Sequence, residues 1–178
     1  LYINEDTGIT DIAMVRQSPN TLFAAAYQRR RSSFGFNGGG PSSAIYKTTD
    51  GGATWKKLIR GLPYENPNDG DTGRIGLCVY RCNPSIVYAI VEHKNGGVFR
   101  SEDGGETWKR MSDVNPRPVY YSQVQIDPNN DLRIWVLGSP LYFSEDGGKT
   151  FERRDTKIHV DFHAIWINPR DSNHIPLG

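Results

Sequence analysis

One octet recurs three times along the chain and constrains its fold more than any other feature. Its pattern is Ser or Thr, any residue, Asp-Gly-Gly, any residue, Thr and an aromatic residue. The copies occupy residues 48–55, 101–108 and 144–151. Paired glycines permit positive φ in a tight hairpin, and the aspartate carboxylate can accept hydrogen bonds from the amides of the turn. The octet therefore predicts three β-hairpins of one kind.

The sequence around each octet repeats as well. A short strand-like segment precedes every copy and a charged one follows it, while two more strand-like segments separated by Asn or Pro turns lie upstream. Each unit is four short strands in about 45 residues, which is typical of a β-propeller blade. We predict an all-β protein with three four-stranded antiparallel blades, at approximately residues 9–60, 73–113 and 119–156.

The flanking segments are interpreted as strands of incomplete blades, at residues 1–5 and 160–168. Three blades cannot close a ring that usually has four to eight, so residues 1–178 are expected to form a single partial propeller. The chain is then either a fragment or one copy of a homo-oligomer that completes the ring. Because unpaired strand edges are usually covered, residues 1–4 are expected to pair with the trailing strand at 163–168 or with another chain.

Composition argues against two classes of partner. Lys and Arg total 21 against 20 for Asp and Glu, and the net charge of +1 provides no strong field for nucleic acid. No apolar run approaches the ~20 residues of a membrane-spanning helix. Cys78 and Cys82 lie in an extended-looking segment and are too far apart for a disulfide unless the chain reverses between them, so their redox state stays open.

The octet resembles the Asp box, also called the bacterial neuraminidase repeat, and the three copies stand in register. Asp-box propellers include sialidases, xyloglucan-type glycoside hydrolases and the sortilin ectodomain. Longer strings, among them Thr72-Gly73-Arg74-Ile75-Gly76 and His159-Val160-Asp161-Phe162-His163, look most like a sortilin-like group of large bacterial secreted proteins. The resemblance implies an extracellular or periplasmic location.

In these families the Asp boxes are structural hairpins far from any active site. The resemblance therefore implies a folding role for the repeated residues, and turn chemistry accounts for the aspartates and threonines without catalysis. The aromatic residues are expected to be largely buried, each closing the last hairpin of its blade. The repeated residues are Asp50, Thr54, Trp55, Asp103, Thr107, Trp108, Asp146, Thr150 and Phe151.

The first strand of each propeller blade lines the axis, so residues near the starts of these strands are expected to gather at one mouth of the central channel. Mixed charge with aromatic rings there suits a polar ligand such as a sugar or a peptide end. The alternative is a solvated channel held by internal ion pairs. The candidates for ligand binding are Asp11, Arg74, Tyr121, Asp161 and His163.

His159, Asp161 and His163 alternate, so on a strand all three would face one way. Channel lining, ligand recognition and metal binding are the three interpretations. Side chains spaced roughly 6.6 Å apart suit chelation poorly, and we expect neither a metal nor a cofactor.

Two functions are compatible with these residues. The first is a binding or scaffold module of sortilin-like type, recognising protein, peptide or glycan without catalysis. The alternative is a fragment of an Asp-box glycoside hydrolase, sialidase-like or xyloglucanase-like, with Asp161 as its catalytic candidate. A glycosidase needs two carboxylates about 5–9.5 Å apart across a cleft, and the acids to examine are Asp11, Asp71, Glu92 and Asp161.

Overall fold

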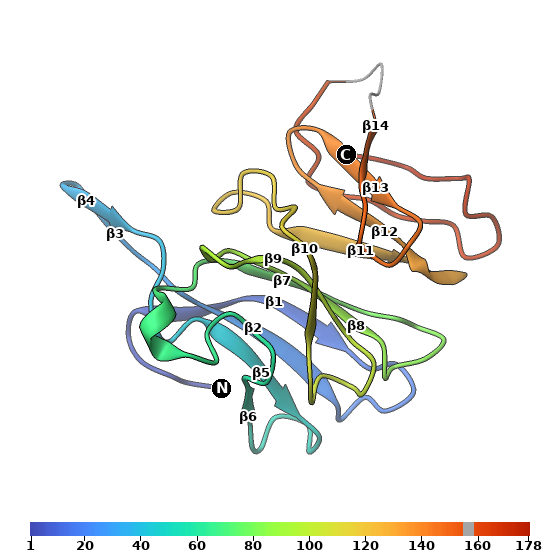
Figure 1. Cartoon of the computed structure of the whole chain (residues 1–178). Coiled ribbons are helices and arrows are strands. Elements are labelled where there is room, and N and C mark those ends of the chain that lie inside the picture. Colours follow the sequence, from blue (N-terminus) through green and yellow to red (C-terminus); the bar gives the residue numbers. More distant parts are fainter. Residues whose placement is uncertain (155–158) are drawn as a thin grey trace.

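The computed structural model describes residues 1–154 and 159–178 and has an all-β fold. Three four-stranded antiparallel sheets follow one another along the chain and stand side by side in an open arrangement (Figure 1). The first contains β1 (Thr7–Met14), β2 (Leu22–Gln28), β5 (Ala44–Thr48) and β6 (Lys56–Leu58). The second contains β7 (Ile75–Val79), β8 (Val87–Val91), β9 (Gly97–Ser101) and β10 (Lys109–Ser112). The third contains β11 (Gln123–Asp127), β12 (Asn130–Leu137), β13 (Leu141–Ser144) and β14 (Glu152–Arg154).

Each sheet is a meander in which strands that follow one another pair, and this confirms the predicted propeller blades. The first strand of the second sheet, β7, contacts both β1 and β11, and these three strands form the inner side of the arrangement. The exact residues at which each predicted blade begins and ends stay a prediction. Residues 155 and 156 of the third predicted blade lie outside the described residues. One turn of 3-10 helix, η1 (Pro67–Asp69), is the helical element of the described residues.

The sheets pack face to face through apolar side chains. Between the first and second sheets lie Phe23, Ile45, Leu58, Leu77 and Trp108. Between the second and third lie Tyr88, Val98, Val124, Ile126 and Ile134. The far face of the third sheet, with Trp135 and Phe143, is covered by Phe162 and Ile167 of the C-terminal segment.

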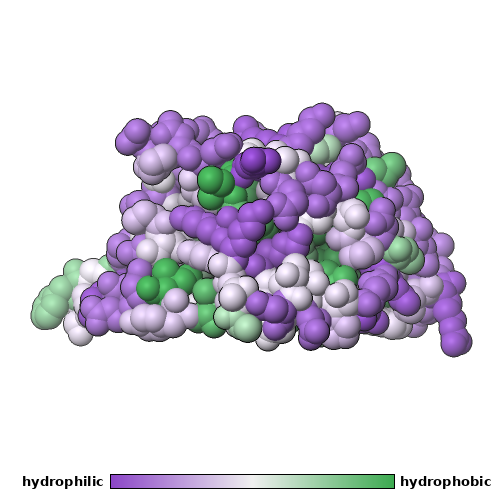
Figure 2. Space-filling view, turned by 90° about the horizontal axis from the view of Figure 1, so that it is seen from below, coloured by the Kyte–Doolittle hydropathy of each residue, from purple (hydrophilic) through white to green (hydrophobic). Residues whose placement is uncertain are grey.

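A hairpin of β3 (Arg30–Ser32) and β4 (Gly35–Asn37) is inserted between β2 and β5 and projects away from the sheets (Figure 1). Phe34 at its tip is fully exposed. Figure 2 shows one face of the molecule, on which hydrophilic residues predominate and hydrophobic residues gather in small separate patches. Cys78 and Cys82 are both free thiols, and burial raises the pKa of Cys78 to about 11.

The chain ends differ from the expectation. Residues 1–5 form no strand; Asn4 instead holds a turn, accepting from Thr7 N at 3.3 Å and donating to Ser42 Oγ at 2.9 Å. The trailing segment at 163–168 bonds to the last residues of the chain, with Ala164 N donating to Gly178 O at 2.8 Å. The expected pairing of residues 1–4 with 163–168 is therefore wrong. Residues 174–178 fold back and accept the hydrogen bonds that the backbone amides of 163–168 donate.

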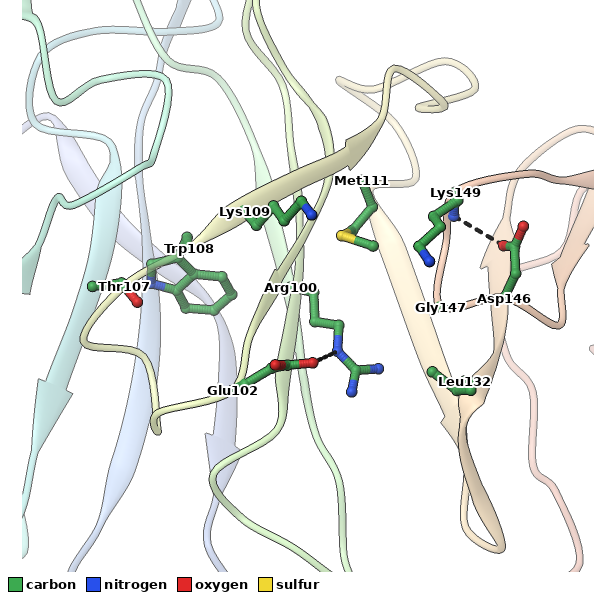
Figure 3. Close-up of a pocket in the computed structure, with 10 residues that line it drawn as sticks. All are labelled: Arg100, Glu102, Thr107, Trp108, Lys109, Met111, Leu132, Asp146, Gly147 and Lys149. Carbon is green, nitrogen blue, oxygen red and sulfur yellow. Dashed lines mark hydrogen bonds and ion pairs between the residues drawn. The ribbon is translucent and has the colours of Figure 1, made fainter.

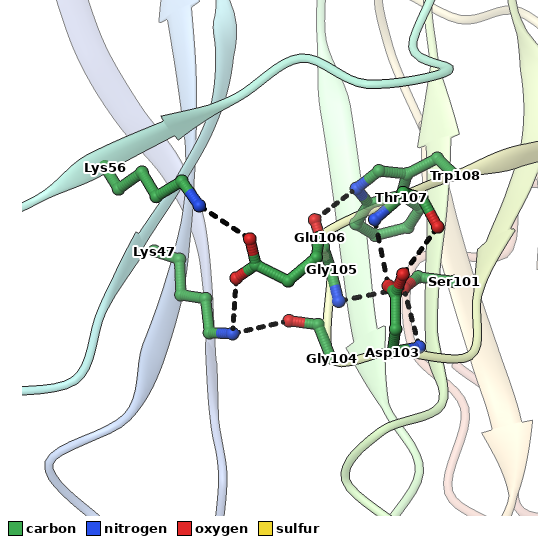
Figure 4. Close-up of polar contacts among 9 residues, drawn as sticks. All are labelled: Lys47, Lys56, Ser101, Asp103, Gly104, Gly105, Glu106, Thr107 and Trp108. Atoms are coloured by element: carbon green, nitrogen blue, oxygen red, sulfur yellow. Dashed lines mark hydrogen bonds and ion pairs between the residues drawn. The ribbon is translucent and has the colours of Figure 1, made fainter.

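Each octet closes its hairpin with the same hydrogen bonds. In the second copy, the Asp103 carboxylate accepts from Thr107 N at 2.9 Å, Thr107 Oγ1 at 2.5 Å and Ser101 Oγ at 2.8 Å (Figure 4). Ser101 Oγ accepts in turn from Gly105 N at 2.8 Å. Gly104 and Gly105 have φ of 69° and 89°, where a Cβ would be strained. The carboxylate is thus engaged by its own turn, which supports a folding role.

The three octet aromatics are not equally buried. Trp108 is 6% exposed, and its Nε1 donates to Gly105 O at 2.9 Å. Trp55 and Phe151 are partly buried, less completely than Trp108. Two of the three rings meet the preceding sheet. Trp108 meets the first sheet, Phe151 lies at the rim of the second core cluster, and Trp55 belongs to the first sheet and has none before it in this chain.

Acid should weaken the fold through these boxes. Burial opposes ionisation of Asp103, yet hydrogen bonds from Thr107, Ser101 and the Glu106 amide lower its pKa to about 2. An unfolded aspartate titrates near ~3.9, so the stabilisation is complete above about pH 4 and is lost as the pH falls toward 2. We expect the urea midpoint to drop across this window, and to drop less in Asp103→Asn. The exposed Asp113→Asn is the control, and an unchanged acid response in Asp103→Asn would contradict the assignment.

Candidate functional site

The inner strands surround a cavity of about 280 Å³, here named the channel cavity. It lies where β1, β7 and β11 meet the C-terminal segment. Three of the five predicted ligand-binding residues line it: Asp11, Arg74 and His163. Uncharged polar side chains of the same wall come from Thr10, Ser122, Gln123 and Gln125.

Asp11 ties two blades together at this cavity. A register shift in the β1–β2 pairing falls between Ile9 and Asp11, and the Asp11 Oδ2 accepts from Leu77 N on β7 at 2.8 Å. Burial raises the pKa of Asp11, opposed by hydrogen bonds from the Leu77 and Ile12 amides and by the charge of Arg74. The carboxylate therefore sits in a partly desolvated place, where a ligand donor would gain more than in water.

Arg74 lies immediately before β7 and is held at both ends. Its backbone N donates to Glu92 Oε2 at 2.8 Å, and its guanidinium donates to Tyr120 O at 2.6 Å. A guanidinium carries five N–H donors, and among the described residues no second acceptor bonds this one. The remaining donors are thus positioned but unused at the edge of the channel cavity.

Tyr121 is fully buried and supports the cavity wall from behind. Its ring lies 4.9 Å from the ring of His163 and 5.0 Å from that of Tyr120. Tyr121 has no exposed surface, whereas His163 is exposed, so Tyr121 supports the position of His163 and cannot itself touch a molecule in the cavity.

Asp161 does not lie on a strand, so the expected one-sided array of His159, Asp161 and His163 is wrong. Asp161 has φ of 102°, a left-handed conformation that breaks the alternation. Its Oδ2 is 3.9 Å from His163 Nε2, and both side chains are exposed to solvent. Within residues 1–154 and 159–178, no three His, Cys, Asp or Glu side chains are placed to share a metal ion.

A second, larger cavity lies beside the first and is here named the loop cavity. It measures about 550 Å³ and is lined by Asp71, Glu92, His93, Arg110, Asp113 and Asn115. Of the four acids considered for a glycosidase pair, Asp71 and Glu92 share this wall, whereas Asp11 and Asp161 do not. Burial raises the pKa of Glu92, opposed by the amide and charge of Arg74.

Sequence reasoning missed His93, Arg110, Asp113 and Asn115. His93 lies in the connection after β8, Arg110 lies on β10, and Asp113 and Asn115 lie in the connection after β10, all outside the repeated octets. Their position was the one sequence feature that could have indicated them, since connections at one end of neighbouring blades gather around the same end of the central channel.

Comparison with known proteins agrees with the repeats and the fold. The profile of the BNR/Asp-box repeat matches residues 46–57 and 99–110; the third octet, with Phe151 in place of Trp, lies outside the match. A xyloglucanase from a Paenibacillus species is 28% identical over 99 residues, which are 55% of this chain and 9% of that protein. This chain thus spans less than a tenth of that relative.

Solved structures share the fold. The GH74 enzyme of Niastella koreensis superposes with a TM-score of 0.62 at 23% identity, covering 90% of this chain and 24% of that one. An ancestral GH74 enzyme gives 0.64 at 18% identity, covering 93% and 23%. YCF48 bound to D1 peptide gives 0.57 at 12% identity, covering 92% and 46%. The chain carries Asp-box repeats on β-propeller blades that do not close a ring, and its described residues contain no helix able to cross a membrane.

Proposed function

We propose that this open Asp-box propeller is a binding module that recognises a glycan at the channel cavity. The observation that carries the proposal is the lining of that cavity, where amide and hydroxyl side chains surround a carboxylate and an underused guanidinium. Such a set offers donors and acceptors in alternation, which suits a ligand rich in hydroxyl groups. The similarity to a xyloglucanase makes a neutral β-glucan oligosaccharide the first ligand to test.

Within this proposal each residue has a separate task. Arg74 donates to sugar oxygens, Asp11 accepts from a hydroxyl, and His163 contacts the ligand from a position set by Tyr121. Asp161, 3.9 Å from the His163 ring nitrogen, orients that ring and has no proton-transfer role. An extracellular or periplasmic location belongs to the same proposal, because polymeric glycans are met there.

Replacing Arg74 with alanine is expected to weaken binding of xyloglucan oligosaccharide at least tenfold in isothermal titration calorimetry, because the cavity loses its cationic donor group. The matched control is Arg81→Ala, an exposed arginine that lines a different cavity. Equal affinities of the two variants would contradict the site. Binding of a peptide but of no oligosaccharide would overturn the ligand class.

A second candidate function rests on the loop cavity. Glu92, with its raised pKa, has the character of a general acid, and Asp71 is the second carboxylate on the same wall. On this alternative the chain is part of a glycoside hydrolase. Hydrolysis of a chromogenic β-glucoside that disappears in Glu92→Gln and in Asp71→Asn, but survives in Asp11→Asn, would favour the enzyme over the binding module.

Self-association is the last part of the proposal. The outer face of the first sheet exposes Ile12 and Met14, at 60% and 51%, and no sheet within residues 1–154 and 159–178 covers it. A second copy seated there would extend the ring. Light scattering after size exclusion should then give twice the 20.0 kDa chain mass, and Ile12→Asp should restore the monomer. A monomeric wild type up to high micromolar concentration rejects this part alone.

A further inference from the structure

The two junctions between neighbouring sheets have the same architecture but opposite chemistry at one position. The octet register makes Lys47 equivalent to Arg100, Lys56 to Lys109, and Glu106 to Lys149. The first member of each pair lies at the junction of the first and second sheets, and the second member at the junction of the second and third. The position that carries a carboxylate at the first junction therefore carries an ammonium group at the second.

At the first junction, the carboxylate of Glu106 bridges two cations (Figure 4). Its Oε1 lies 3.2 Å from Lys47 Nζ, and its Oε2 lies 2.6 Å from Lys56 Nζ. The hydrogen bond from Lys56 and the pairing with Lys47 lower the pKa of Glu106 against the effect of burial. This junction therefore demonstrates, inside the same protein, that the geometry between two Asp boxes accommodates a carboxylate.

At the second junction, the position equivalent to Glu106 carries an ammonium group and not a carboxylate. A cavity of about 340 Å³ lies between the sheets there (Figure 3). Lys149 stands where Glu106 stands in the first junction. Figure 3 shows the side chains of Lys109 and Lys149 on the two sides of Met111. Among the described residues, neither ammonium group has an ion pair or hydrogen-bond partner.

The other charges around this cavity are already compensated. Arg100 is paired with Glu102 at 3.0 Å and with Asp131 at 2.6 Å. The Asp146 carboxylate accepts from Thr150 and Ser144 of its own box. The charge left without a counterion is therefore the pair of Lys109 and Lys149.

Apart from Thr107 and Gly147, the remaining wall is apolar and consists of Trp108, Met111 and Leu132, the last of them 43% exposed. A cavity with two unpaired cations and an apolar wall fits an organic anion better than a small inorganic one, because the carbon skeleton covers the wall while the carboxylate meets the cations.

We propose that the second junction cavity binds the carboxylate of an acidic sugar such as a uronate. The ligand carboxylate lies between Lys109 and Lys149 and neutralises the free cations of this junction, as Glu106 neutralises Lys47 and Lys56 at the first junction. The C–H face of the sugar ring packs on Met111 and Leu132 beside Trp108. This site is separate from the channel cavity and does not depend on the function proposed for it.

The test titrates the protein with sodium glucuronate and, as the uncharged match, glucose, following heat or the Trp108 fluorescence. Wild type should bind glucuronate and not glucose. Lys149→Glu restores to the second junction the carboxylate that the first junction has, so it should fold normally and lose at least tenfold in affinity. Lys94→Glu, the same charge change at a surface position paired with Asp69, should bind as wild type does.

The proposal is overturned if wild type does not bind glucuronate, if Lys149→Glu binds it equally well, or if sulfate binds as tightly as glucuronate. Arg74→Ala should leave glucuronate affinity unchanged, which separates failure of this site from failure of the channel cavity. Lys109→Ala provides a second variant without a new carboxylate, and an affinity equal to that of wild type there would also reject the site.

Discussion

Replacing Trp108 with alanine is expected to lower the free energy of unfolding by about 3–5 kcal/mol, the largest effect of any single octet residue. Its ring fills the junction of the first and second sheets, packed with Phe23, Leu58 and Leu62. The backbone also holds the junction, since Trp108 N donates to Arg60 O at 3.0 Å. Removing the ring leaves a cavity that a β-sheet interface cannot collapse to fill.

Trp55→Ala is the matched control, because it removes the same side chain from the same octet position. Trp55 is half-buried and meets no preceding sheet, so its loss should cost clearly less than that of Trp108. Urea unfolding followed by circular dichroism measures both variants. Equal losses would show that the octet tryptophan stabilises its own hairpin and not the junction between sheets.

Replacing Gly76 with alanine is expected to cost about 3 kcal/mol, the upper end of typical overpacking penalties. Gly76 lies on β7, where a Cβ would be 1.9 Å from the backbone oxygen of Ser122, just before β11. A backbone atom cannot rotate away as a side chain can, so the inner strands of the second and third sheets must separate. Because Ser122 also lines the channel cavity, ligand binding there should weaken together with stability.

Gly8→Ala serves as the control for this substitution. Gly8 lies on β1, and a Cβ there meets no atom within 4 Å. Its unfolding midpoint in urea should match that of the wild type. Should Gly76→Ala unfold at the same urea concentration as Gly8→Ala, the close approach of β7 to the third sheet would not be a constraint on the fold.

Part of the candidate site follows from the repeat alone. Equivalent first strands had to meet at the axis, so Asp11 and Arg74 were predicted to converge, and both line the channel cavity. The prediction treated Asp161 and His163 as strand residues, and this failed because a left-handed residue interrupts the segment. Backbone conformation at a single residue depends on its tertiary surroundings, and no sequence pattern encoded it.

The local structure of this protein follows from residues that are close together in the chain. Asp-Gly-Gly turns, a hydroxyl residue before them and apolar alternation beside them act within a few residues, so three hairpins and the strands around them could be read directly. What each equivalent position does depends on contacts between sheets. Trp108 is buried and Trp55 only partly so, and Glu106 is neutralised at the first junction whereas Lys149 is left unpaired at the second. Burial and charge pairing depend on the neighbouring sheet, which local sequence does not specify.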